Sequence, residues 1–222
     1  SWQEGILLVD IKDPQATTWI SMEAKEGEVK HFLPDEIGNE NKDVLDELAD
    51  AVIVGLRDYC QKSGIKQIVL GLSGGIDSAV AACVAAEAVG PENVLGISMP
   101  SRISSQHSMD DAKYTAEALG MEYLTISIDS HHSGIEQRLE QMLEEGSKVA
   151  AENIQSRLRG ILVMAHANAQ GRMAIATGNK SELAQGYCTL YGDMAGGYTP
   201  LGDVYKMDVY GLAEVFNRRA LE

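Results

Sequence analysis

Short apolar segments alternate with helical segments through most of this 222-residue chain, and this alternation limits the folds that the chain can adopt. Four segments are rich enough in buried-type residues to be strands, at residues 67–72, 93–99, 122–129 and 172–177. The stretches between them are predicted to be helices, over residues 78–89, 108–119, 134–145 and 148–169. Near-continuous apolar strands joined through helices are typical of a parallel sheet covered on both faces. We therefore predict an α/β fold whose ligands bind beyond the carboxyl ends of the strands.

The first forty residues have a different character. Three short strands are predicted over residues 5–11, 17–22 and 29–33, and they carry too little apolar surface to form a core of their own. A polar stretch over residues 34–41 follows, and then apolar residues at helical spacing predict a helix from Leu45 to about Tyr59, closed by Gly64. This part is expected to be an edge or a linker rather than an independent domain.

The composition excludes several classes of protein. The formal net charge is −15, and a field of that sign repels the phosphate backbones of nucleic acids. No apolar run approaches the roughly eighteen residues of a membrane span. The three cysteines, Cys60, Cys83 and Cys188, form neither a CxxC pair nor an even framework, which favours a reducing, cytoplasmic setting and argues against a structural zinc. We expect no nucleic-acid partner and no membrane partner.

The stretch LGLSGGIDSAVAA, residues 70–82, joins a predicted strand to a predicted helix through two adjacent glycines. Such a turn lets the backbone approach a ligand and gathers several N–H groups, to which the helix adds its positive end, so it favours an anion. Ser73 and Ser78 can donate hydroxyl hydrogen bonds from either side. The carboxylate of Asp77 would repel a phosphate unless a cation lay between them, which predicts Mg²⁺ bridging to phosphate oxygens.

Two other interpretations of this stretch remain open. Residues 71–75 also satisfy the G-x-S-x-G pattern of a serine hydrolase, with Ser73 as nucleophile and a histidine such as His131, His132 or His166 as base. An Asp-Ser cap on an ordinary helix would fit as well, although it would not need two glycines together.

The SGGIDS sequence resembles the SGGxDS signature of the ATP pyrophosphatase superfamily, whose members release pyrophosphate after attack on the α-phosphorus of ATP. Other stretches resemble the NAD synthetases of the glutamine-dependent kind: residues 176–182 (ATGNKSE), 186–193 (GYCTLYGD), 152–159 (ENIQSRLR) and 99–102 (MPSR). The resemblance covers about residues 41–220. GMP-synthetase-like and tRNA-modifying relatives share the first signature, and they are the alternative within the superfamily.

The resemblance implies a parallel sheet of the adenine nucleotide alpha hydrolase-like, Rossmann-like type. It implies ATP-dependent amidation of deamido-NAD to NAD through an adenylated nicotinate, with Mg²⁺, AMP and pyrophosphate. The catalytic candidates are Asp77 and Glu182; Asp77 would hold the metal, and Glu182 would share it or orient the second substrate. The expected ATP-binding residues are Gly71, Leu72, Ser73, Gly74, Gly75, Ile76, Asp77, Ser78, Arg102, Thr177 and Lys206. Those expected at deamido-NAD are Asn153, Glu182, Tyr187, Cys188, Thr189 and Leu190.

The same resemblance organises the chain. Residues 1–11 resemble the closing strand of a nitrilase-type glutaminase domain, and residues 12–40 would be a linker. Residues 41–222 would be a C-terminally incomplete synthetase domain, because members of the family have a further segment after the matching part. We expect ammonia to come from glutamine through that glutaminase domain, or from solution. The family commonly pairs through helices beside the dinucleotide site, so a homo-oligomer is expected.

Overall fold

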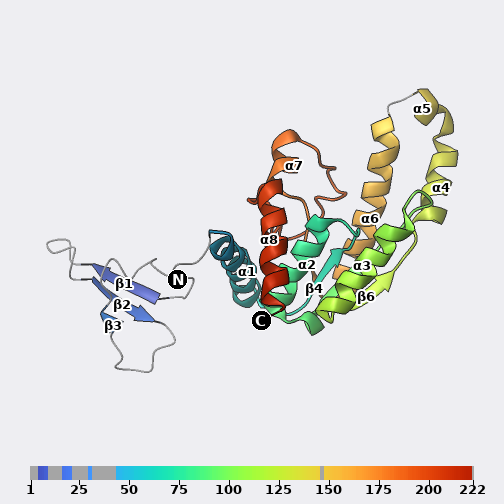
Figure 1. Ribbon diagram of the computed structural model, residues 1–222. Helices are drawn as coiled ribbons and strands as arrows, with labels where there is room; N and C mark the ends of the chain where they lie inside the picture. The colour runs from blue at the N-terminus through green and yellow to red at the C-terminus, as the bar shows by residue number, and fades with distance from the viewer. Residues whose placement is uncertain (1–4, 10–16, 22–29, 32–43, 146–147, 222) are drawn as a thin grey trace. The chain divides into compact units, whose positions relative to one another are not determined.

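The four apolar segments in the later part of the chain pair as one parallel sheet in the computed structural model (Figure 1). Its strands are β4 (Ile68–Gly71), β5 (Val94–Ser98), β6 (Glu122–Thr125) and β7 (Met173–Ala174), in the spatial order β6-β5-β4-β7. β5 pairs with one side of β4 and β7 with the other. The direction of winding therefore reverses after β6, and the carboxyl ends of β4 and β7 border the crevice where such sheets bind ligands.

The structure describes residues 5–9, 17–21, 30–31, 44–145 and 148–221. The chain divides into two units, Ser1–Ala51 and Val52–Glu222. In the first unit β1 (Gly5–Val9), β2 (Thr17–Ser21) and β3 (Lys30–His31) form an antiparallel sheet, with Leu7 opposite Trp19. These strands lie within the three predicted segments, and the rest of those segments, like the polar stretch 34–41, lies outside the described residues. Helix α1 (Val44–Lys62) follows, and Gly64 after it adopts φ +70°.

Helices cover both faces of the parallel sheet. On one face Val69, Leu95 and Ile97 pack with Val163 and Ala167 of α6 (Lys148–Gln170). Because side chains alternate along a strand, the neighbouring strand residues point to the other face. There α2 (Ile76–Val89) contacts β4 and β5, and α3 (Gln106–Leu119) contacts β5 and β6. Helix α8 (Lys206–Arg219) packs against α2, as Figure 1 shows.

The burial of their side chains explains why β5 and α2 lie at the centre of the fold. Strand β5 is buried along its whole length, and helix α2, rich in alanine, has most of its residues buried. Each fully buried Val, Leu or Ile side chain contributes about 1.5–3 kcal/mol relative to exposure. No helix among the described residues is long and apolar enough to cross a membrane.

The prediction for residues 122–145 was wrong in two respects. The strand over 122–129 ends at Thr125, and Asp129 instead begins helix α4 (Asp129–Arg138). The helix over 134–145 is two helices, α4 and α5 (Glu140–Glu145), because the chain breaks from helical geometry at Leu139, with ψ 12°. The first turn of α4 is polar and buries only a single side chain among its described residues, His132, so it lacks the apolar period by which helices are recognised.

Candidate active site

The glycine turn leaves β4 at its carboxyl end and enters α2. Gly74 adopts φ +81°, and a Cβ built there would lie 2.1 Å from the carbonyl oxygen of Ser108 at the start of α3. Both the backbone conformation and the close approach therefore require glycine at this position. The turn therefore packs between α2 and the start of α3, and its backbone faces the space beyond the carboxyl end of β4.

Two serines hold the turn in this shape. The amide N–H of Ser73 donates to Ser78 Oγ at 3.2 Å, and Ser78 Oγ donates to the carbonyl of Gly75 at 2.8 Å. Ser73 Oγ lies 3.1 Å from Ser78 Oγ and accepts the N–H of Gly75 at 3.1 Å. Ser78 is buried and turned into the loop, so it braces the turn, whereas Ser73 stays more exposed at its surface.

Asp77 lies in the first turn of α2 and is held through both of its carboxylate oxygens. Oδ1 accepts a hydrogen bond from Asn179 Nδ2 at 2.9 Å, and Oδ2 forms an ion pair with Lys206 Nζ. The Asp77 side chain is 19% exposed and that of Lys206 is 36% exposed, so the pair lies at the rim of the fold. The predicted residues Asp77 and Lys206, 129 positions apart, thus come together.

Glu182 joins the same cluster through the short helix α7 (Lys180–Gln185). Asn179 caps this helix: its Oδ1 accepts the N–H of Glu182 at 3.0 Å, and Glu182 Oε2 accepts the N–H of Asn179 at 3.0 Å. The reciprocal pair is a capping box, which satisfies two otherwise unpaired N–H donors. Asn179 therefore contacts both of the predicted catalytic carboxylates.

A cavity of about 550 Å³ lies beside this cluster, beyond the ends of β4, β5 and β7. Of the predicted ATP-binding residues, Gly71, Leu72, Ser73 and Thr177 line it. Its other walls come from the loop after β5, the start of α3, the middle of α6, and Gly192, Asp193 and Ala195. Gly74, Gly75, Ile76, Asp77, Ser78 and Lys206 belong to the turn and the carboxylate cluster at its side.

Arg159 of α6 is a wall residue that the site prediction omitted, although it stands in the ENIQSRLR stretch. Its Nε donates to the carbonyl of Met99 at 3.1 Å, and it lines the cavity. Burial lowers the pKa of the Arg159 guanidinium from its ordinary value. A guanidinium remains protonated even so, and it places a positive charge in the cavity wall.

Apart from Glu182 in α7, the residues predicted to contact the dinucleotide lie in the loop after α7 and on α6. Thr189 Oγ1 donates to Asn153 Oδ1 at 2.8 Å, and Arg157 Nε donates to the carbonyl of Leu190 at 3.2 Å. Backbone packing brings the loop still closer, because a Cβ on Gly160 would lie 2.7 Å from the carbonyl oxygen of Tyr191. The loop is thus seated directly on the helix.

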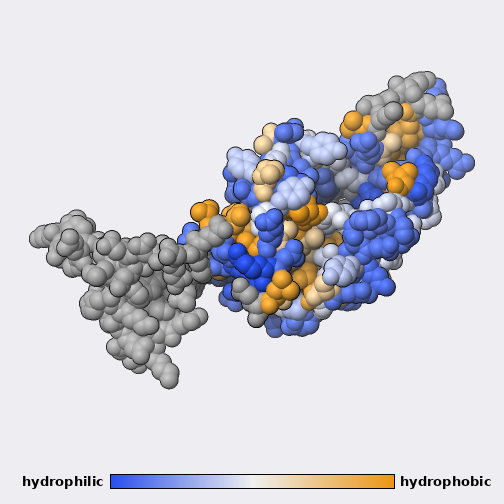
Figure 2. Space-filling model, viewed as in Figure 1, coloured by the Kyte–Doolittle hydropathy of each residue, from blue (hydrophilic) through white to orange (hydrophobic). Residues whose placement is uncertain are grey.

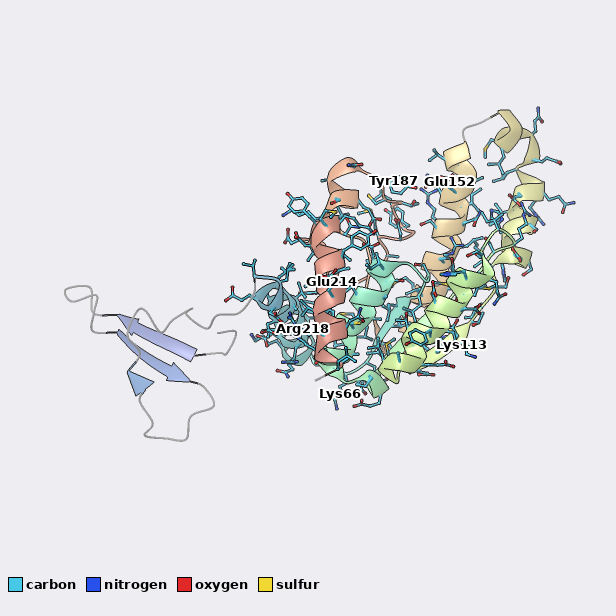
Figure 3. The ribbon with its side chains drawn as sticks, in the orientation of Figure 1. Lys66, Lys113, Glu152, Tyr187, Glu214 and Arg218 are labelled. Carbon is cyan, nitrogen blue, oxygen red and sulfur yellow. The ribbon has the colours of Figure 1, made fainter. Side chains whose placement is uncertain are left out.

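Two large side chains of this loop project outward. Tyr187 is 76% exposed and Leu190 is 63% exposed, while Cys188 between them is half-buried. Figure 3 shows Tyr187 beyond α7, toward the beginning of α6 where Glu152 is labelled. The loop thereby offers aromatic and aliphatic surface next to the cavity.

Arg102 points elsewhere. Its Nη2 donates to Glu136 of α4 at 2.7 Å, and its backbone N–H donates to Asp129 Oδ1 at 2.6 Å. Its neighbour Ile103 lines the cavity. The structure places Arg102 at the border of the cavity, engaged with α4 rather than with Asp77.

The geometry disfavours the hydrolase interpretation. Within the described part of the chain, no histidine is among the hydrogen-bond partners of Ser73, which are Ser78 and Gly75.

The described residues hold no group of three or more His, Cys, Asp and Glu side chains that could by themselves bind a metal. A cation bound by one or two carboxylates takes its remaining ligands from water or from a substrate.

Comparison with known proteins gives one consistent family. The model of the NAD synthase family matches residues 48–219. A glutamine-dependent NAD(+) synthetase of Rhodobacter capsulatus is 52% identical over 161 residues, which are 72% of this chain and 29% of that relative. The chain thus spans less than a third of the relative's length.

Solved structures agree in fold. The glutamine-dependent NAD+ synthetase of Acinetobacter baumannii in complex with ADP matches with a TM-score of 0.79 and 38% identity, over 87% of this chain and 36% of that one. The NH3-dependent NAD synthetase of Campylobacter jejuni matches with a TM-score of 0.72 and 32% identity, over 79% of this chain and 75% of that one.

Proposed function

The chain belongs to the NAD synthase family, and on that premise we propose that its site converts deamido-NAD to NAD at the expense of ATP. The nicotinate carboxylate attacks the α-phosphorus of ATP, and the bond to pyrophosphate breaks. Ammonia then attacks the acyl carbon of the adenylate, and AMP leaves with one of the original carboxylate oxygens. A free carboxylate is a poor acceptor for ammonia, whereas the adenylate carries a good leaving group.

The observation that carries this proposal is the position of the glycine turn beside the cavity. Ser73 lines the cavity, and Asp77, four residues later, is paired with Lys206 at its side. The open backbone of Gly74 and Gly75, together with the positive end of α2, favours the β- and γ-phosphates there. Thr177 at the end of β7 then lies on the adenosine side. No step needs a covalent enzyme intermediate, because positioning and neutralisation of charge suffice.

Lys206 supplies a mobile positive charge for the leaving group. Its ammonium ends a flexible stem, and its backbone N–H is fixed by Ser181 Oγ at 3.0 Å. It can therefore offset the negative charge of pyrophosphate as that charge develops. Arg159 adds a further positive charge in the wall of the cavity.

The donor set suits Mg²⁺, which prefers hard oxygen ligands and is usually bound by one or two carboxylates together with substrate phosphates and water. Asp77 is the carboxylate at the turn, and Glu182 is linked to it through Asn179. Asp77, with or without Glu182, would hold the ion, which when bound supplies charge neutralisation between the protein and the phosphates.

The loop from Tyr187 to Leu190 is proposed to receive deamido-NAD. Its exposed tyrosine and leucine offer stacking and apolar contact for a nicotinate ring, while Asn153 supplies an amide. The relative from R. capsulatus is named for glutamine and that from C. jejuni for ammonia. We infer that the matched region itself uses ammonia, which a glutaminase domain provides from glutamine in proteins that contain one.

The test is a product balance by mass spectrometry, with ATP, Mg²⁺, deamido-NAD and ammonium. We expect AMP, pyrophosphate and NAD in equal amounts, and no AMP when deamido-NAD is left out. Release of ADP and phosphate, or AMP formation that ignores deamido-NAD, would contradict the proposal. Glutamine in place of ammonium distinguishes the source of nitrogen.

A further inference from the structure

Asn179 is the most enclosed polar residue beside the site. It is 0% exposed, although it lies in the loop between β7 and α7 and caps α7. Its side chain spans two segments that lie 102 residues apart, because Nδ2 donates to the carboxylate of Asp77 and Oδ1 accepts from the backbone N–H of Glu182. The carboxylate of Glu182 in turn accepts from the backbone N–H of Asn179. An ordinary N-cap satisfies only its own helix.

The chemistry of these contacts selects asparagine. One planar amide supplies both the donor that a carboxylate requires and the acceptor that a backbone N–H requires. An aspartate could still cap α7, but it would set a second negative charge against Asp77. A serine could also cap α7, but its shorter side chain would not reach Asp77 Oδ1, now 2.9 Å from the amide nitrogen.

The contacts leave Asp77 little freedom to turn. Asn179 holds Oδ1 and Lys206 holds Oδ2, and both partners come from the segment that follows β7. Lys206 is itself anchored to α7 through Ser181 Oγ. The orientation of the carboxylate on α2 is therefore set by α7 and the start of α8.

We propose that Asn179 is a positioning residue that couples Asp77 to Glu182, so that both carboxylates face one metal–nucleotide complex as a unit. This inference rests on the proposed function and adds a role for a residue that does not touch the reacting atoms. Partners that orient a metal ligand typically change metal affinity about 10–100-fold when they are removed.

The test measures the dissociation constant of ADP by calorimetry with Mg²⁺ and with EDTA, for the unaltered chain and for Asn179→Ser and Asn179→Asp. The dissociation constant with EDTA divided by the dissociation constant with Mg²⁺ measures the coupling between metal and nucleotide. We expect Asn179→Ser to reduce this ratio about tenfold. Asn179→Asp is expected to weaken metal-free binding and to raise the ratio, because its added negative charge is relieved only when the cation is present.

The control is Asn93→Ala, which removes a comparable amide hydrogen bond, 2.8 Å to the carbonyl of Val89, at the opposite end of β5. It should leave the ratio unchanged. A ratio that is the same in both Asn179 variants and the unaltered chain would overturn the coupling role. Failure of the unaltered chain to bind ADP at all would instead count against the proposed function.

A measurement on the unaltered chain guards against variants that do not fold. The side-chain ¹⁵N–¹H₂ signals of Asn179 should shift when Mg²⁺ and ADP are added together, and shift less with ADP alone. Identical signals in the free chain, with ADP alone, and with ADP and Mg²⁺ together would also overturn the proposal.

Discussion

Single residues of the turn fix where a phosphate could lie. Gly74 combines a positive φ with a backbone approach that excludes any Cβ, and Asp77 is bound on both oxygens. Both features are local, and the chain holds a similar residue away from the candidate site for each: a positive-φ glycine and an aspartate paired with a lysine. Paired substitutions can therefore separate the general cost of a change from its cost at the site.

Gly74→Ala is expected to weaken ADP binding at least about tenfold, because the new Cβ would collide with the carbonyl of Ser108. Gly64→Ala is the matched control: Gly64 has φ +70°, but nothing lies within 4 Å of its Cβ position. It should destabilise the fold by about 1–2 kcal/mol and leave binding intact. Calorimetry and thermal unfolding measure the two effects, and equal binding losses in both variants would contradict the account.

Asp77→Asn is expected to lower pyrophosphate release at least about 100-fold while the fold persists. The new amide can still accept from Asn179, but it can no longer pair with Lys206 or hold a cation. Asp58→Asn removes a similar pair, Lys62 with Asp58 at 2.9 Å, on the surface of α1, and should leave the rate unchanged. Full activity in Asp77→Asn would exclude the assigned role.

Whole elements, rather than single residues, bring the loop proposed for deamido-NAD to the cavity. The loop after α7 is held to α6 by a hydrogen bond from Thr189 to Asn153, by one from Arg157 to the carbonyl of Leu190, and by the close contact at Gly160. Helix α6 therefore serves both the sheet, through Val163, and the site. A change on α6 that leaves the core intact should affect the loop selectively.

Gly160→Ala tests this. Its Cβ would meet the carbonyls of Tyr191 and Gly192 at 2.7 and 2.9 Å, so the loop must move away. We expect KM for deamido-NAD to rise at least about tenfold and the dissociation constant of ADP to change less. Gly134→Ala, in α4 with nothing within 4 Å, should stabilise the chain by about 0.5–1 kcal/mol without affecting either constant. Equal effects on both ligands would contradict the division of roles.

At this scale the sequence predicted well where hydrophobic pattern decides the structure. Strands β4 and β5 and helix α2 are continuous apolar segments and were found to within two residues. Strand β7 covers only two residues of a six-residue prediction, and Ile175, directly after it, forms an isolated bridge with Tyr198 instead of extending the strand. Asn179 was missed because a capping asparagine looks the same in sequence whether or not it reaches a distant carboxylate. Arg102 was predicted to bind ATP, which stays a prediction, and its spacing in the sequence could not reveal that its side chain pairs with Glu136 on α4.

The unit from Val52 onward contains the cavity, the charged cluster around Asp77 and the exposed loop after α7. On the face shown in Figure 2, hydrophobic side chains lie among hydrophilic ones rather than in one continuous area. Because the net charge is −15, the proposed binding of a triphosphate would require cations at the site to offset the repulsion, and Lys206, Arg159 and Mg²⁺ are the proposed ones. We expect nucleotide affinity to fall when Mg²⁺ is removed with EDTA.

The central claim is that the nicotinate carboxylate attacks the α-phosphorus of ATP. It is tested most directly with deamido-NAD labelled with ¹⁸O in both nicotinate carboxylate oxygens, incubated with ATP, Mg²⁺ and ammonium. The account predicts that each AMP released carries one ¹⁸O and that the amide oxygen of NAD retains the other. AMP without ¹⁸O, or label found in pyrophosphate, would contradict it.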